Sequence, residues 1–259
     1  MVDCKYVWTG LLVLLILVAS APALMPVVKA QEYMTLSPSS ATVEASGPYG
    51  STNYVIGITN YGGTSDYVTF SSIAFTSGIS TGLTPTFNPG YISVPSGGTA
   101  YSYVTITASG ATPGTVTFTV NAYSTVWGTA IPSQTATLKI ISTGAPDFSI
   151  TPTGNSFSVT AGQSLYTTVD VTPLNGFTTT AYGTVTLNIA NPPSGSYVTP
   201  TSVTITGTSA VTGYLTMTTA TTLPTGTYYL ALTGTNTTIT KVYILYLYVT
   251  GGVGTFTLS

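Results

Sequence analysis

The sequence contains very little charge. Charged residues are 4% of its 259 residues, with four lysines, six carboxylates, no arginine and no histidine, whereas about 25% is usual for soluble domains. Without histidine, and with Cys4 as the single cysteine, the usual nucleophile–base pairs and zinc ligands are missing. A chain without a basic patch is also a poor ligand for nucleic acid. We therefore predict a protein that is not an enzyme, with no catalytic residue, metal site or cofactor and no nucleic-acid partner.

Long apolar runs are almost absent, and the one that exists lies at the start. Leu11–Val18 follows Lys5, and small residues lead to Val28–Ala30, an order typical of a secretory signal with its cleavage site. We predict a signal peptide at 1–30 and an extracellular, cell-surface location, with membrane contact only through an uncleaved signal. A retained N-terminal anchor is the alternative. Cys4 leaves with the signal, so no disulfide stabilises the rest of the chain.

The charges that remain after the signal are two lysines and five carboxylates: Lys139, Lys241, Glu32, Glu44, Asp66, Asp147 and Asp170. Stability depends on pH only through groups whose pKa differs between the folded and unfolded states. With so few groups, we expect stability to be flat from about pH 2 to about pH 8. This would suit a protein exposed to acidic or hot surroundings.

Internal repeats organise the rest of the chain. Four blocks recur in one order with nearly constant gaps: YMTLSP (33–38) with DFSITP (147–152), FNPGYISV (87–94) with VTPTSVTI (198–205), YVTITASGATP (103–113) with YLTMTTATTLP (214–224), and GTVTFTV (114–120) with GTYYLAL (226–232). The repeats predict two units, 31–143 and 147–250, joined by a short linker.

Each unit is predicted to consist of short strands. Segments such as TVTFTV, TYYLAL and SVTIT alternate threonine with apolar or aromatic residues, which is the period of a half-buried strand. Clusters of Gly, Pro, Asn and Ser separate them. No window after the signal has helical periodicity, which argues against a parallel α/β fold because the crossover helices are missing. Turn signals at a spacing of roughly 8–12 residues indicate antiparallel β-sandwiches.

The second unit carries the most specific pattern. Its segments VTPLNGF (171–177), GTVTL (183–187) and PTGTYYLALTGT (224–235) resemble the tandem immunoglobulin-like repeats of secreted archaeal and bacterial surface proteins. The resemblance covers nearly all of unit two and, more loosely, unit one. It departs at TTTAY (178–182), an insertion expected to lengthen a loop. It implies an all-β fold, two tandem antiparallel immunoglobulin-like β-sandwiches after a signal peptide, with no catalytic residue and no fixed ligand.

The last residues, 251–259, are interpreted as a linker and the first strand of a third unit. GGVGTFTLS aligns with TGAPDFSIT (143–151), which matches Phe256 to Phe148 and Leu258 to Ile150. This spare strand, with the signal and the low charge, is similar to archaeal surface filaments of the thread type, in which each subunit gives a terminal strand to its neighbour. The resemblance implies that the donor strand is Thr255, Phe256, Thr257 and Leu258 or, alternatively, Tyr33, Met34, Thr35 and Leu36.

Two other interpretations remain open. The chain is alternatively a monomeric adhesive or glycan-binding module, a rod of two sandwiches that acts as a spacer. It could also be the appendage of a secreted hydrolase whose catalytic domain follows Ser259. The expected partners are other copies of the chain or surface-layer proteins, and glycans.

Three residues are candidates for covalent modification. Asn236 begins NTT, the only N-glycosylation sequon of the sequence. Lys139 and Lys241 lie in apolar strands, and the resemblance makes each a candidate for a lysine–asparagine isopeptide crosslink. The alternative is that each lysine protects an edge strand from wrong pairing.

The carboxylates suggest two further sites. Asp66 with Asn60 or with neighbouring carbonyls is a candidate set of oxygen ligands for calcium. Asp147 and Asp170 would have to meet in space to form a glycosidase pair. A linker residue and a turn residue are the simpler interpretation of these two aspartates.

Overall fold

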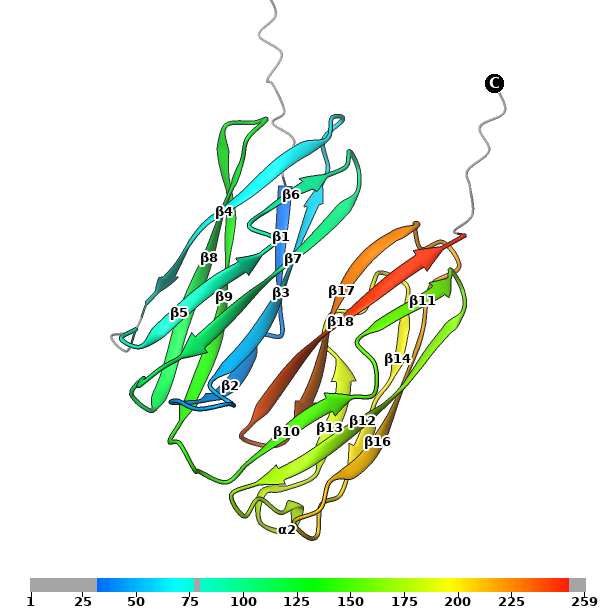
Figure 1. Cartoon of the computed structure of the whole chain (residues 1–259). Helices are drawn as coiled ribbons and strands as arrows, with labels where there is room; N and C mark the ends of the chain where they lie inside the picture. Colours follow the sequence, from blue (N-terminus) through cyan, green and yellow to red (C-terminus); the bar gives the residue numbers. More distant parts are fainter. Residues whose placement is uncertain (1–31, 77–79, 252–259) are drawn as a thin grey trace, which may run out of the picture.

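The structure, a computed structural model, describes residues 32–76 and 80–251 (Figure 1). The predicted signal peptide and the donor-strand candidate Thr255–Leu258 lie outside the described residues. The first half contains β1 (Glu32–Ser37), β2 (Ser40–Glu44), β3 (Ser51–Asn60), β4 (Asp66–Phe75), β5 (Leu83–Asn88), β6 (Tyr91–Val94), β7 (Thr99–Ala108), β8 (Gly114–Ser124) and β9 (Thr129–Ile141). The second half contains β10 (Asp147–Pro152), β11 (Ser156–Thr160), β12 (Ser164–Leu174), α2 (Thr179–Tyr182), β13 (Val185–Ile189), β14 (Tyr197–Thr199), β15 (Thr201–Val203), β16 (Val211–Thr218), β17 (Gly226–Thr235) and β18 (Thr240–Thr250).

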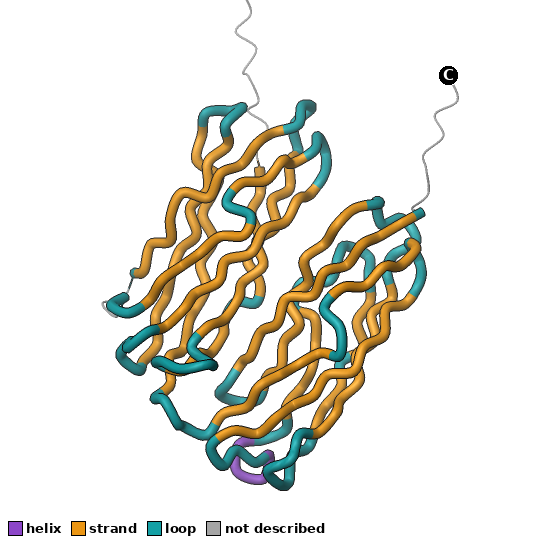
Figure 2. Tube along the Cα trace, in the orientation of Figure 1, coloured by secondary structure: helices purple, strands orange, loops and turns teal. Residues whose placement is uncertain are grey.

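The alternation of threonine with apolar residues produces these strands. In β8, Val116, Phe118 and Val120 are buried, whereas the threonines between them are partly exposed. A branched threonine side chain fits the pleated outer face of a strand, while the apolar side chains point into the core. Figure 2 shows that strands make up most of the described chain.

The two halves have the same topology. The first half forms a four-stranded sheet in the order β1-β3-β7-β5 and a five-stranded sheet in the order β2-β9-β8-β4-β6. The second half repeats these orders as β10-β12-β16-β14 and β11-β18-β17-β13-β15. One hydrophobic core lies between the two sheets of each half. The chain is therefore two tandem immunoglobulin-like β-sandwiches, called here sandwich 1 and sandwich 2.

The described sheets are antiparallel, as predicted, except at one strand pair in each sandwich. The short strand β2 pairs in parallel with β9, and its counterpart β11 pairs in parallel with β18. All other strand pairs are antiparallel. The reason is that the chain leaves the first strand of each unit through a turn and crosses to the other sheet, where it runs beside the last strand in the same direction.

The insertion at residues 178–182 forms a small helical turn. It contains α2, which joins β12 to β13, and Gly183 at the end of α2 has a φ of 83°, a conformation that glycine adopts without strain. The flanking strands keep their places in the sheets. The insertion thus lengthens a connection and leaves the strand pairing intact.

The sandwiches pack side by side and not as an extended rod (Figures 1 and 2). The outer face of β3 and β7 in sandwich 1 contacts β17 and β18 in sandwich 2. The first and last described residues lie at one end of the molecule and the linker lies at the other end (Figure 1). The four sheets therefore form four layers. Besides the core inside each sandwich, a thinner apolar layer lies between the sandwiches.

Gly234 provides a test of how closely the core of sandwich 2 is packed. A Cβ atom at this position would lie 2.6 Å from Ile150 Cγ2 and 3.2 Å from Phe148 Cε2. We predict that Gly234→Ala destabilises the protein by about 1–3 kcal/mol, because these side chains must shift. A Cβ atom added at Gly207 would have no atom within 4 Å, so Gly207→Ala is the matched control. Equal melting temperatures for the two variants in calorimetry would contradict the packing.

Candidate functional site

The layer between the sandwiches is built from tyrosines around three small or aliphatic side chains. Val55, Ala231 and Ile244 are buried at its centre. Tyr101, Tyr103, Tyr229, Val242 and Tyr246 are partly buried around them. These residues occupy the outward positions of strands whose other face lines a core, because side chains alternate along a strand. We call this set the tyrosine layer.

Tyr229 is the central ring of the tyrosine layer. Its ring centroid lies 5.6 Å from that of Tyr103 and 5.4 Å from that of Tyr246, and both pairs are edge-to-face. Such geometry is favourable because the positive edge of one ring meets the negative face of another. Tyr103 belongs to sandwich 1 and Tyr229 to sandwich 2, so the stacking joins the two sandwiches.

Hydrogen bonds complete the layer. The side-chain amide of Asn88 donates to Tyr103 Oη at 2.6 Å, and the hydroxyls of Tyr103 and Tyr246 are 3.4 Å apart. The hydrogen bond with Tyr103, together with burial, raises the pKa of Tyr246 to about 12. The hydroxyl of Tyr246 therefore stays neutral and remains a donor at any physiological pH.

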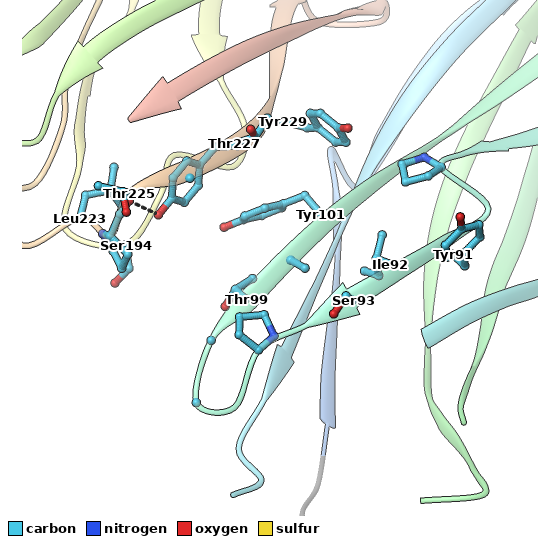
Figure 3. A pocket seen from close by; sticks show the side chains of 18 residues that line it. Tyr91, Ile92, Ser93, Thr99, Tyr101, Ser194, Leu223, Thr225, Thr227 and Tyr229 are labelled. Carbon is cyan, nitrogen blue, oxygen red and sulfur yellow. Dashed lines mark hydrogen bonds between the residues drawn. The ribbon is translucent and has the colours of Figure 1, made fainter. Parts of the chain in front are cut away.

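A cleft of about 820 Å³ opens at one end of the tyrosine layer (Figure 3). Its walls come from β6 and β7 of sandwich 1 and from the start of β17 in sandwich 2, with the rings of Tyr101 and Tyr228 5.6 Å apart. Burial raises the pKa of Tyr101 to about 12. The other residues that line the cleft include Tyr91, Ser93, Thr99, Ser194, Thr225, Thr227 and Tyr229. No charged residue is among the described residues that line the cleft.

The opposite end of the junction, near the linker, contains buried charges. Lys241 Nζ lies 2.6 Å from Asp147 Oδ2 within sandwich 2 and 3.4 Å from the carbonyl oxygen of Thr42 in sandwich 1. Lys139 Nζ of sandwich 1 donates to the carbonyl of Thr238 in sandwich 2 at 2.9 Å. Both lysines thus tie the sandwiches together through backbone oxygens.

Asp147 is held in a low-polarity environment. It is fully buried, and its Oδ1 accepts a hydrogen bond from the backbone N–H of Phe148 at 2.8 Å. Burial raises the pKa of Asp147 despite the opposing effect of Lys241, and the charge of the nearby Glu44 raises it further. Glu44 is itself 3% exposed and accepts a hydrogen bond from Asn175. The carboxyl of Asp147 therefore lies between the ammonium of Lys241, which it contacts, and the charge of Glu44, which acts on it without contacting Lys241 within the described residues.

A second carboxyl pair lies at the other end of sandwich 1. Glu32, the first residue of β1, is hydrogen-bonded to Asp66, the first residue of β4, and the two are 5% and 0% exposed. Burial, the hydrogen bond and the charge of Asp66 raise the pKa of Glu32 from 4.5 to about 8. Burial opposes ionisation of Asp66, but hydrogen bonds from Glu32, Ser124, Val126 and Tyr67 outweigh it and lower the pKa of Asp66.

A single proton on Glu32 accounts for the hydrogen bond between the two buried carboxyl groups. Glu32 Oε1 and Asp66 Oδ2 have no hydrogen-bond partner within the described part of the chain when both groups are drawn as carboxylates. A proton on Glu32, whose pKa is raised, turns this carboxyl into a donor to Asp66. The pair is thus a carboxylic acid that binds a carboxylate.

The glycosylation sequon lies in the turn between β17 and β18. Asn236 Oδ1 accepts hydrogen bonds from the backbone N–H groups of Thr238 and Ile239, and its Nδ2 donates to the carbonyl of Tyr182 at 3.0 Å. Asn236 is half-buried, while the two threonines after it are exposed. Its side chain thus organises this turn, and glycosylation of Asn236 stays a prediction.

The other sequence candidates are placed as follows. The alternative donor strand Tyr33–Leu36 is part of β1, which pairs with β3 of its own sandwich from Glu32 to Ser37. Asp147 and Asp170 lie at opposite ends of the β10–β12 pair, and Asp170 is exposed. The structure does not bring these two aspartates together. Asn60 binds backbone groups of its own loop, and the partner of Asp66 is Glu32.

Sequence reasoning missed the partners of these charged residues. It did not pair Glu32 with Asp66 or Lys241 with Asp147, although one signal was present. Glu32 and Met34 lie on the same face of an alternating strand, so the inward position of Met34 implied an inward Glu32. No signal in the sequence indicated which outward tyrosines would meet across two units.

Residues 32–76 and 80–251 contain neither a metal-binding cluster nor a membrane-spanning helix. No group of three or more His, Cys, Asp or Glu side chains could hold a metal ion there. In the same ranges, no helix is long and apolar enough to cross a membrane.

No protein-family model matches the chain, and no curated protein sequence matches it. Solved structures with related folds share little sequence. A family 123 glycoside hydrolase from Clostridium perfringens is 10% identical over 43% of this chain, which spans 27% of that enzyme, with a TM-score of 0.33. The Escherichia coli adhesin FdeC is 14% identical over 86% of this chain and 64% of its own, with a TM-score of 0.27. A chain of the complex between Dpr2 Ig1-Ig2 and DIP-Theta Ig1-Ig3 is 14% identical over 85% of this chain and 99% of its own, with a TM-score of 0.30. The chain is therefore similar to these proteins in outline only, and the similarity assigns no function.

Proposed function

We propose that this protein is a non-enzymatic structural component of the cell exterior that assembles when a strand of one copy joins a sheet of another. The observation that carries the proposal is the role of the first strand in each sandwich. β1 and β10 each lie at a sheet edge and pair with a single neighbour, β3 and β12. The sequence of residues 255–258 repeats the alternation of these two strands.

The first strands supply large apolar side chains to the cores. Met34 of β1 and Phe148 of β10 are fully buried, and Ile150 is 7% exposed. Phe256 and Leu258 stand at the positions that match Phe148 and Ile150. A strand of this pattern is stable only where a sheet edge accepts its backbone and a core accepts its alternate side chains.

The position beside β3 is the acceptor that fits this strand. Only six residue pairs join β1 to β3. Exchange of β1 for an incoming strand therefore breaks one short ladder and the hydrogen bond between Glu32 and Asp66, and leaves β3-β7-β5 intact. Phe256 would then enter the place of Met34 and Leu258 that of Leu36. Assembly in this form needs no cofactor and no charged contact, consistent with a chain that carries so little charge.

Removal of residues 254–259 tests the proposal. We predict that filaments or layers seen by negative-stain electron microscopy of the native surface protein disappear in this variant, while its melting temperature is unchanged, because the sandwiches do not depend on the segment. The matched pair is Phe256→Thr with Leu258→Thr, which removes the anchors, against Thr255→Ser with Thr257→Ser, which keeps them. Filaments that persist after the deletion would contradict this donor strand and leave Tyr33–Leu36 as the candidate.

A second candidate function is binding of a neutral saccharide in the cleft. The supporting observation is its lining, which combines tyrosine rings with serine and threonine hydroxyls and no charge. Tyr91 is 68% exposed at the rim and offers an open ring face. A rise of the melting temperature with a neutral oligosaccharide, lost in Tyr91→Ala, would support binding; no shift at millimolar sugar would count against it.

A further inference from the structure

Three exposed tyrosines share the outer face of the sheet β10-β12-β16-β14 in sandwich 2. The rings of Tyr166 and Tyr214 stack with their centroids 6.0 Å apart, and the two residues are 58% and 53% exposed. Tyr197 of β14, opposite Thr218 of β16, is 67% exposed. We call this face, with Tyr166, Tyr197 and Tyr214, the outer tyrosine face. Tyrosine is enriched in protein–protein interfaces, so a face of this composition suits a partner protein.

The equivalent face of sandwich 1 is occupied by sandwich 2. The sheet orders match β3 and β7 to β12 and β16, and the repeat blocks match Tyr103 to Tyr214. Tyr103 packs its ring against Tyr229 of β17, and Val55 of β3 is buried together with Ala231 of β17. The junction between the sandwiches therefore shows which sheet accepts a face of this kind, namely the sheet that contains β17 and β18.

The matching sheet of sandwich 1 is open on its outer side. The sheet orders match β17 and β18 to β8 and β9. Because β3 and β7 contact β17 and β18, the sheets that contain β8-β9 and β12-β16 are the outermost of the four layers. One chain cannot bring these two sheets together, whereas two copies can. Such a contact joins different surfaces of the two copies, so it repeats from copy to copy unless its rotation closes a ring.

We infer that the outer tyrosine face of sandwich 2 binds the β8–β9 face of sandwich 1 in a second copy, in the geometry of the existing junction. This inference rests on the proposed assembly of copies, to which it adds the interface that fixes how successive copies lie. In this interface Thr168 takes the place of Val55, and Thr119 of the second copy takes the place of Ala231. The short threonine side chains of β8 leave room for the stacked rings of the first copy.

The spacing of the chain after β18 agrees with this geometry. In the alignment of 251–259 with 143–151, Thr255 matches Asp147, the first residue of β10. Residues 251–254 thus separate β18 from the donor candidate, whereas residues 142–146 separate β9 from β10. A strand donated by this segment would hold the receiving sandwich as close to sandwich 2 as the linker holds sandwich 2 to sandwich 1.

The cleft end of the existing junction shows which residues would meet at the corresponding end of the new one. Tyr101 of β7 and Thr227 of β17 line the same cleft. The repeats match Tyr101 to Thr212 and Thr227 to Thr115. Thr212 of one copy and Thr115 of the second copy would therefore lie near each other in the docked pair.

Opposite charges stand beside these two threonines. Asp170 is the cross-strand neighbour of Thr212, and Lys139 is the cross-strand neighbour of Thr115. Asp170 is the only charged residue of β12 and β16, and Lys139 is the only one of β8 and β9. The Lys139 ammonium has three N–H donors, of which the carbonyl of Thr238 takes one. Docking thus brings complementary charges together and favours this pair of faces over a pair of identical faces.

Crosslinking between copies tests the inference. Full chains with Cys4→Ser and Thr168→Cys are mixed with full chains with Cys4→Ser and Thr119→Cys, allowed to assemble, and treated with a short bismaleimide. We expect dimers on a denaturing gel, at least fivefold above either variant alone, because docking raises the effective concentration of the two thiols. Thr86→Cys, at an exposed threonine on the other sheet of sandwich 1, replaces Thr119→Cys as the matched control. Absence of the dimer, or an equal yield with Thr86→Cys, would overturn the inference.

A ring deletion tests the part played by the tyrosines. Tyr214→Ala in the Thr168→Cys chain should lower the crosslinked fraction at least fivefold. Tyr61→Ala, at a ring that is 68% exposed outside this face, should leave the fraction unchanged. Both variants should keep the melting temperature of the parent chain, because both rings are exposed. A crosslinked fraction that is equal in the two variants would show that the outer tyrosine face does not bind the second copy.

Removal of residues 254–259 separates this inference from strand donation. If strand donation is wrong and docking is right, the deletion variant still assembles and still gives the crosslink between positions 168 and 119. If strand donation is right and docking is wrong, the complete chain assembles without this crosslink.

Discussion

The protein should lose stability as the pH rises from about 5 to about 8.5, and Glu32→Gln should remove most of this loss. The pKa of Glu32 is about 8 in the folded chain against 4.5 ordinarily. A carboxyl whose folded pKa is raised contributes its full stability below the unfolded pKa and loses it as the pH rises through the folded pKa. The raised pKa of Asp147 acts in the same direction.

The size of this effect follows from the linkage between pKa and free energy. Each tenfold change in an acid dissociation constant is worth about 1.4 kcal/mol. Solvent near the end of the sheet screens part of the interaction between Glu32 and Asp66 and reduces this value. We therefore expect the free energy of unfolding to fall by roughly 2–4 kcal/mol over this range. Asp66 has a lowered pKa and acts oppositely, so its contribution is lost as the pH falls below about 4.

Thermal unfolding between pH 3 and pH 9 measures this prediction. Glu32→Gln keeps a neutral donor to Asp66 and should melt above the wild type at pH 8.5 and close to it at pH 5. Asp170→Asn, at an exposed carboxylate, should follow the wild type throughout. A wild-type melting temperature that is constant from pH 5 to pH 8.5 would contradict the shared proton and favour the flat profile expected from the scarcity of charge.

Ala231→Asp should separate the two sandwiches. Ala231 is completely buried in the tyrosine layer, and the described structure offers no positive charge within that layer to pair with a carboxylate. An unpaired buried charge is costly, so the layer should open and let water reach the carboxylate. We expect a loss of about 2–5 kcal/mol in the free energy that couples the sandwiches.

Calorimetry and small-angle scattering measure this second effect together. The wild type should unfold in one transition because the tyrosine layer couples the sandwiches, whereas Ala231→Asp should show two transitions and a larger radius of gyration. Thr227→Asp places the same charge four residues earlier on the same face of β17, where the side chain is exposed, and should behave as the wild type. An unchanged single transition in Ala231→Asp would show that the layer does not couple the sandwiches.

The sequence was sufficient to predict the fold class because its signals are local. Threonine alternation in segments such as 114–120 predicts strands, and the recurrence of whole blocks predicts that one topology occurs twice. The parallel pairs β2–β9 and β11–β18 were not predictable in this way. They depend on which sheet a five-residue strand joins after a turn, and a short apolar strand fits an edge of either sheet.

The candidate sites were less predictable because they join residues far apart in the sequence. Lys241 was recognised as unusual in an apolar strand, but its partner Asp147 stands 94 positions earlier, and no local pattern links them. The tyrosine layer depends on the angle between two units and so on a linker whose sequence does not specify that angle. The donor segment 255–258 lies outside the described residues, and its role stays a prediction.

The common position of the two described ends has a mechanical consequence. A pull between the start of β1 and the end of β18 acts at one end of the molecule, while the linker holds the sandwiches together at the other (Figure 1). Such a force is not transmitted through one sandwich and then the other, as it would be in an extended rod. It peels the tyrosine layer open from the cleft toward the linker, one ring contact at a time, and lets the molecule lengthen before either core is strained. Because the ring contacts are neutral and re-form without a chemical step, the tyrosine layer can open under load and close again when the load is removed. The junction between the sandwiches then extends reversibly before either sandwich unfolds.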